Sequence, residues 1–61
     1  MSEEAVFIYH QESNGRWKWH LIAPGGETIA NSCTDFATEG DCLEDIQTVM
    51  NYAKSAKILK K

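Results

Sequence analysis

The sequence predicts a small α+β domain, in which one amphipathic helix covers one face of a three-stranded antiparallel meander. Three observations predict this fold class. Residues 5–11 and 16–22 alternate in the period-two pattern of β-strands. Turn signals at 14–15 and 24–26 separate three strand-like segments. Apolar residues then recur at helical spacing through residues 39–55.

Length and composition limit what this chain can be. With 61 residues it forms one domain at most, and we expect a disordered tail at 1–4 followed by a folded domain at 5–61. A domain of about this size buries only roughly 60% of its unfolded surface, so an isolated monomer is marginal. Two cysteines make no disulfide scaffold, and no apolar run is long enough for a membrane span, which predicts a cytoplasmic protein.

The first hairpin is predicted from Asn14-Gly15, because a type I′ turn requires positive φ at both central positions. A two-residue turn there pairs Ile8 with Leu21 and places segment 16–22 at the centre of the meander. Directly opposed residues on paired strands share a face, so Ile8 is expected to lie with Leu21 against the helix.

The second hairpin has two possible loops. A two-residue loop at Gly25-Gly26 pairs Leu21 with Ala30, whereas a three-residue loop that includes Pro24 pairs Leu21 with Ile29. We prefer the longer loop, because proline presets φ at the first turn position and Gly26 can adopt the left-handed conformation of a G1 bulge.

The two hairpins together predict the faces of the sheet and the core. The reverse face, away from the helix, carries Phe7, Tyr9, Lys18, His20, Ile22, Thr28 and Ala30. Thr38 is the expected N-cap of a helix from Glu39 to about Ser55, and Phe36 is the expected anchor of the connector before it. The predicted core consists of Val6, Ile8, Trp17, Trp19, Leu21, Ile29, Leu43, Ile46, Val49 and Met50.

The C-terminal segment AKILKK leaves two apolar residues, Ile58 and Leu59, beyond a helix whose apolar arc is already complete. It is either a frayed helix end or a short strand that pairs with an open sheet edge of its own chain or of another copy. Since the chain is also small, we expect an obligate homodimer with Ile58 and Leu59 at the interface.

Several short motifs resemble the YegP-like family of small uncharacterised domains. They are V-x-I-Y at Val6 to Tyr9, W-x-W-x-L at Trp17 to Leu21, G-E-x-I-A-x-S at Gly26 to Ser32, Phe36, and the helix pair Ile46 and Val49. The resemblance implies a β-β-β-α-β unit that assembles with exchanged C-terminal strands, here in a homodimer. The longer first loop and the Pro24-Gly25-Gly26 turn depart from the family pattern. The family brings no established activity and no catalytic residues.

The residues that could carry chemistry give no catalytic constellation. His10, His20, Cys33 and Cys42 are suitable zinc ligands, but no pair has the short spacing of a structural site, so we expect no metal and no cofactor. The carboxylates of the first helical turns are expected to form a solvated face near the positive end of the helix dipole.

The reverse face is the candidate binding surface, because one helix cannot cover both faces of a sheet. It joins apolar side chains to basic groups, and the residues expected to bind are Phe7, Tyr9, Lys18, His20 and Ile22. A solvated face that tolerates a few apolar residues is the simpler interpretation.

Two functions from different classes follow. The favoured one is a non-catalytic binding or interaction module, a homodimer that contacts a protein or a small ligand. The alternative is a small metal-dependent or thiol-dependent enzyme with a site at the dimer seam. Stacking aromatics beside Lys18 suggest single-stranded nucleic acid as a ligand, but the net charge of -3 disfavours it.

Overall fold

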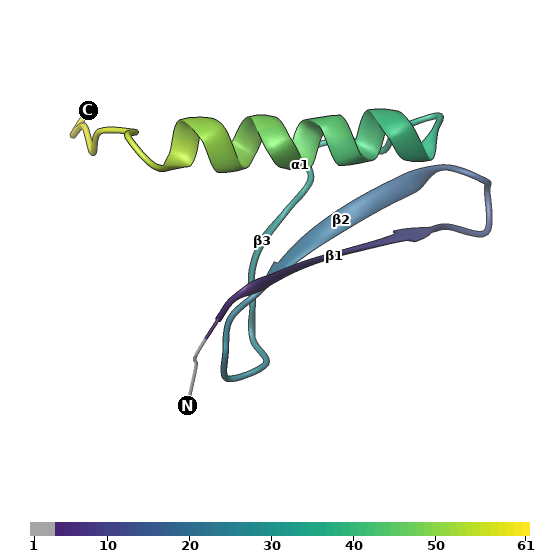
Figure 1. Ribbon diagram of the computed structural model, residues 1–61, viewed down its shortest axis with the longest axis horizontal. Coiled ribbons are helices and arrows are strands. Elements are labelled where there is room, and N and C mark those ends of the chain that lie inside the picture. Colours follow the sequence, from purple (N-terminus) through teal and green to yellow (C-terminus); the bar gives the residue numbers. More distant parts are fainter. Residues whose placement is uncertain (1–3) are drawn as a thin grey trace.

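The computed structural model describes residues 4–61 as a three-stranded antiparallel sheet with one helix across one face (Figure 1). The strands are β1 (Val6–Gln11), β2 (Trp17–Ile22) and β3 (Thr28–Asn31), in the order β1-β2-β3, and the helix is α1 (Glu39–Ala53). The predicted meander with a central β2 is therefore confirmed. Most of the tail expected at 1–4 lies outside the described residues.

The first hairpin differs from its prediction by one residue. Its loop has three residues, because the Gly15 N–H donates to the Glu12 carbonyl at 2.8 Å and the Glu12 N–H donates to the Arg16 carbonyl at 2.7 Å. Gly15 has a φ of 88°, but Asn14 does not take the positive φ that a type I′ turn requires. Asn14 instead accepts a hydrogen bond from the Arg16 N–H through its side-chain oxygen, at 2.9 Å.

This shift of one residue reverses the two faces of β1. Phe7 pairs with Leu21 and Tyr9 with Trp19, so both aromatic side chains lie on the helix side of the sheet. Val6 and Ile8, which were predicted to be core residues, lie on the opposite side and are 48% and 49% exposed. The predicted pairing of Ile8 with Leu21 is wrong, and Ile8 pairs with His20.

The second hairpin has the predicted three-residue loop. The Ala23 N–H donates to the Glu27 carbonyl at 2.7 Å, and Gly26 has a φ of 98°. A register shift between Leu21 and Ile22 then pairs Leu21 with Ala30. Ala30 therefore packs against the core, and the prediction that Ile29 would do so is wrong.

The connector and the start of α1 follow the prediction. Phe36 forms a two-way backbone bridge with Trp17, with both N–H to carbonyl distances at 2.8 Å, and its side chain packs against the core. The Thr38 side chain accepts a hydrogen bond from the Asp41 N–H at 3.1 Å, which satisfies one of the free N–H groups at the helix start.

The core is small and lies between the N-terminal part of α1 and the middle of the sheet. Trp19, Cys42 and Ile46 are the buried hydrophobic side chains of the described chain. The helix packs on β1 and β2, and Figure 1 shows it diverging from the sheet toward its C-terminal end. Met50, predicted to be a core residue, lies in the C-terminal half of α1 and is 45% exposed for this reason. Leu43, also predicted to be a core residue, is 40% exposed although it lies near the start of the helix.

The C-terminal segment makes no strand in this single chain. Beyond α1, residues 56–61 have no regular secondary structure. Ile58 is fully exposed and Leu59 is 80% exposed, so neither apolar side chain packs against the rest of the chain.

Candidate functional site

The face of the sheet that α1 does not cover is the candidate site, and we call it the open sheet face. The observed strand pairs assign its residues, because opposed residues share a face. The first hairpin contributes Val6, Ile8, His10, Lys18, His20 and Ile22. Its apolar residues lie toward the start of β1 and the end of β2, and its polar residues lie toward the first hairpin loop. The face is therefore amphipathic along its length.

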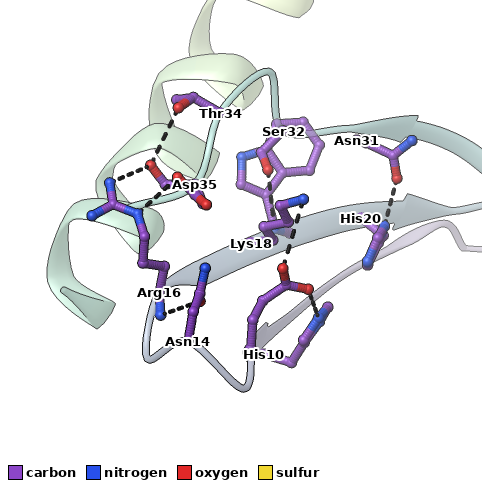
Figure 2. A network of polar contacts seen from close by, with 11 residues as sticks. His10, Asn14, Arg16, Lys18, His20, Asn31, Ser32, Thr34 and Asp35 are labelled. Atoms are coloured by element: carbon purple, nitrogen blue, oxygen red, sulfur yellow. Dashed lines mark hydrogen bonds and ion pairs between the residues drawn. The ribbon is translucent and has the colours of Figure 1, made fainter. Parts of the chain in front are cut away.

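A polar network organises the loop end of this face (Figure 2). Glu12 contacts both neighbours: its Oε2 lies within hydrogen-bond distance of His10 Nε2, at 3.1 Å, and its Oε1 forms an ion pair with Lys18 Nζ at 3.7 Å. On the same face, toward β3, His20 Nδ1 contacts the side-chain oxygen of Asn31. The charge of Lys18 is thus offset by Glu12, and this end of the face is not strongly basic.

His10 and His20 lie beside each other on this face, on adjacent strands. Their rings are 5.3 Å apart between centroids and inclined by only 11°. The pair arises from the register, because His10 is opposed to Lys18 and His20 to Ile8, which places the two histidines on a diagonal across the strands.

The structure brings together only part of the predicted binding set. Lys18, His20 and Ile22 share the open sheet face, as expected. Phe7 and Tyr9 do not join them, because the one-residue shift of the first hairpin turns both toward α1. His10, which was not in the predicted set, occupies the same face.

Two hydrogen bonds connect the sheet to α1. Trp19 Nε1 donates to Asp45 Oδ2 at 2.7 Å, and the Tyr9 hydroxyl donates to Glu39 Oε2 at 2.9 Å. These carboxylates were expected to be solvated, but each serves as the acceptor that a tryptophan or tyrosine at a core needs. The presence of two such aromatic donors opposite an acidic helix start was the signal that could have predicted this.

The remaining candidate groups are dispersed. Burial raises the pKa of the Cys42 thiol, and the nearby charges of Asp45 and Glu39 raise it further, so this thiol is a poor nucleophile. Cys33 is exposed in the connector. Within residues 4–61, no three His, Cys, Asp or Glu side chains are grouped so that together they could hold a metal ion.

The comparison with protein families is decisive for classification. The family described as "Domain of unknown function (DUF1508)" matches residues 12–59, which is most of the chain. This is the YegP-like family. The chain belongs to it.

A solved structure supports the fold of this YegP-like chain. The solution structure titled "NMR solution structure of the protein from Haloferax volcanii" matches with a TM-score of 0.84 and 20% sequence identity. The match covers 98% of this chain and all of the other. No curated protein matches the sequence. At this identity the likeness concerns the fold alone.

The helix of this YegP-like chain can also be compared with what a membrane-spanning helix requires. None of the helices in the described residues combines the length and the apolar character that a membrane crossing requires.

The contact between Tyr9 and Glu39 gives a testable pH dependence. The hydrogen bond to Glu39 is the main cause of a raised pKa for Tyr9, and the carboxylate charge is the next. Because the pKa of Tyr9 is higher in the folded state than in the unfolded state, this contact contributes stability that is present below the unfolded pKa and is lost as pH rises through the folded pKa. Glu39→Gln removes the carboxylate that raises the pKa, so it should lower the pKa of Tyr9 toward its ordinary value.

The measurement is an ultraviolet titration of tyrosinate in a Tyr52→Phe background, since Tyr52 is the other tyrosine and is exposed. Glu44→Gln is the matched control, because it removes a carboxylate from the same helix but leaves Glu39, the acceptor of the Tyr9 hydroxyl, in place. A Tyr9 titration curve that is the same in Glu39→Gln and in the parent would contradict the assigned hydrogen bond.

Proposed function

We propose that this chain is a non-catalytic binding module that works as a homodimer with exchanged C-terminal segments. One observation carries the proposal: the core holds three buried side chains, while two adjacent apolar residues, Ile58 and Leu59, are 100% and 80% exposed. A second copy is the simplest partner that would bury them.

The sheet offers a place for the exchanged segment. β1 and β3 each pair with β2 alone among the described strands, so both outer edges have backbone groups without a strand partner. An extended segment that carries Ile58 and Leu59 could add to such an edge of the other copy. Its two side chains would then meet the apolar surface left where α1 diverges from the sheet, which includes Met50.

The open sheet face is the binding surface of this proposal. Val6 and Ile8 supply half-exposed apolar area, and Lys18, His20 and Ile22 continue the same surface across β2. Phe7 and Tyr9, which pack toward α1, would support it from behind. A protein segment or a small ligand with both apolar and polar groups suits this surface. The net charge of -3 disfavours single-stranded nucleic acid.

Two experiments test the dimer with exchanged C-terminal segments. Sedimentation equilibrium of the full chain should give twice the chain mass, and mixed labelled and unlabelled chains should show intermolecular NMR contacts from Ile58 and Leu59. A monomer over the whole concentration range, or contacts confined to one chain, would overturn the exchange.

The binding surface is tested separately by chemical-shift mapping with a partner isolated on the full chain. Shifts should concentrate at Ile8, His20 and Ile22. Shifts restricted to the exposed side of α1 would reject the open sheet face as the binding surface.

A further inference from the structure

The two outer edges of the sheet differ in how well they could receive another strand. β1 is a continuous strand of six residues, Val6–Gln11, with an unbroken register against β2 and with no Lys, Arg, Asp, Glu or Pro in it. β3 has only four residues, Thr28–Asn31, and a register shift interrupts its pairing with β2. Natural sheet edges are protected from further pairing by charges, prolines, bulges and short strands. β3 has two of these protections, and β1 has none of them.

The hydrogen bonds of the first hairpin identify the free backbone groups on the β1 edge. The Glu12 N–H donates to the Arg16 carbonyl at 2.7 Å, so the backbone of Glu12 faces the neighbouring strand. Backbone groups alternate in direction along an antiparallel strand, so every second residue before Glu12 also bonds to β2. The residues between them point their N–H and C=O groups away from β2, toward the open edge. They are Phe7, Tyr9 and Gln11.

The position of the helix also favours the β1 side of the sheet. Among the described elements, α1 contacts β1 and β2 but not β3, so a strand added to β1 would continue the part of the sheet that the helix covers. β1 carries apolar side chains on both faces, with Phe7 toward the helix and with Val6 and Ile8 on the open sheet face. Val6 and Ile8 are half-exposed, so they have apolar area left to bury against an added strand.

The C-terminal segment has the properties that this edge requires. Residues 56–61 have no regular secondary structure, match the length of β1, and continue past the end of α1 without turning back to the strands (Figure 1). Residues 54–61 also carry four lysines and no acidic residue. All nine acidic residues and only two of the six basic ones lie in the remaining chain. The segment is therefore attracted to the acidic body of another copy.

We propose that residues 56–61 of a second copy add as a fourth strand to the outer edge of β1, and not to β3. This inference rests on the exchanged homodimer proposed above and specifies where the segment binds. Its backbone pairs with Phe7, Tyr9 and Gln11, so the order in each sheet becomes exchanged segment, β1, β2, β3. The two-fold symmetry of a homodimer repeats the contact, because each copy gives one segment and receives one.

Amide hydrogen exchange of the full chain, followed by NMR, tests the choice of edge. In the dimer, the amides of Phe7, Tyr9 and Gln11 should be as protected as those of Ile8 and His10, which bond to β2. A dimer in which these three outward amides exchange rapidly would overturn the β1 edge and leave the exchanged homodimer intact. A chain that stays monomeric at every concentration would overturn both proposals.

Proline variants give an independent measurement, because proline is tolerated on an edge strand where its missing N–H would face away from the sheet. Gln11→Pro should weaken association by about 10-fold or more in sedimentation equilibrium, since each of the two symmetric contacts loses a hydrogen bond. Gln11→Ala is one matched control, because it keeps the backbone N–H. Asn31→Pro is the other, because Asn31 faces the outer edge of β3: the next residue, Ser32, donates its N–H to the Trp19 carbonyl of β2.

Both control variants should associate like the parent chain, and amide spectra establish that the sheet of each variant is folded. A folded Gln11→Pro chain that associates like the parent would overturn the β1 edge. So would an Asn31→Pro chain that alone loses association, because that result would place the exchanged segment on β3.

Discussion

Trp19→Ala should destabilise the protein by about 3–5 kcal/mol, as large aromatic deletions in cores do. Trp19 is only 4% exposed, and its ring packs edge to face against Phe7 with centroids 5.3 Å apart. The substitution also removes the N–H that donates to Asp45 at 2.7 Å, which leaves that carboxylate without its partner. Trp19 is one of only three buried hydrophobic side chains among the described residues, so its loss removes a large share of the core.

Denaturant melts at a fixed protein concentration measure the effect, because stability of an associating chain depends on concentration. Trp19→Phe separates the two contributions, since it keeps an aromatic ring and removes the N–H, and it should cost less than the alanine variant. Ile8→Ala is the matched control from the open sheet face, where a half-exposed side chain should cost about 1 kcal/mol or less. A loss below about 1 kcal/mol for Trp19→Ala would contradict its place in the core.

The strands and the helix could be predicted because their signals are local. The alternation of Trp17, Trp19 and Leu21 places all three on the helix side of the sheet, and the helical repeat identifies α1 with its Thr38 cap. These signals depend on a few consecutive residues and on backbone preferences, which a sequence displays directly.

The orientation of β1 could not be predicted in this way, because both of its faces are apolar at its start. Val6 and Ile8 alternate with Phe7 and Tyr9, so the period identifies a strand without saying which face is buried. The choice of the buried face then depended on the loop length at Asn14-Gly15, because a two-residue loop and a three-residue loop shift the strand pairing by one residue. The aromatic pair buries more apolar area against α1, and this favours the observed register.

The same reasoning explains the candidate site. Lys18, His20 and Ile22 lie on β2, whose orientation the tryptophans determine, and they were placed correctly on the open sheet face. His10 lies on β1, so its position beside His20 depended on the register that the sequence left ambiguous. The bulge in β3 has a similar consequence, because it replaces Ile29 by Ala30 opposite Leu21 without any glycine or proline to signal it.

Deleting residues 57–61 should convert the proposed homodimer into a monomer that is largely unfolded. The deletion removes Ile58 and Leu59, which are 100% and 80% exposed in the single chain, so a large effect on stability points to burial against another copy. If the segment adds a strand to the partner, its backbone hydrogen bonds and apolar side chains stabilise both copies, because each copy gives one segment and receives one. Stability of the intact protein should then rise with protein concentration.

Sedimentation and thermal melts of the truncated and intact chains measure this effect. The matched controls are a deletion of Lys60 and Lys61, which keeps both apolar residues, and the point variant Leu59→Asp, which keeps the length. The first should behave like the intact chain and the second like the truncation, because burial of apolar side chains rather than loss of charge is responsible. A truncated protein that stays dimeric with an unchanged melting temperature would show that this segment is not the exchanged strand.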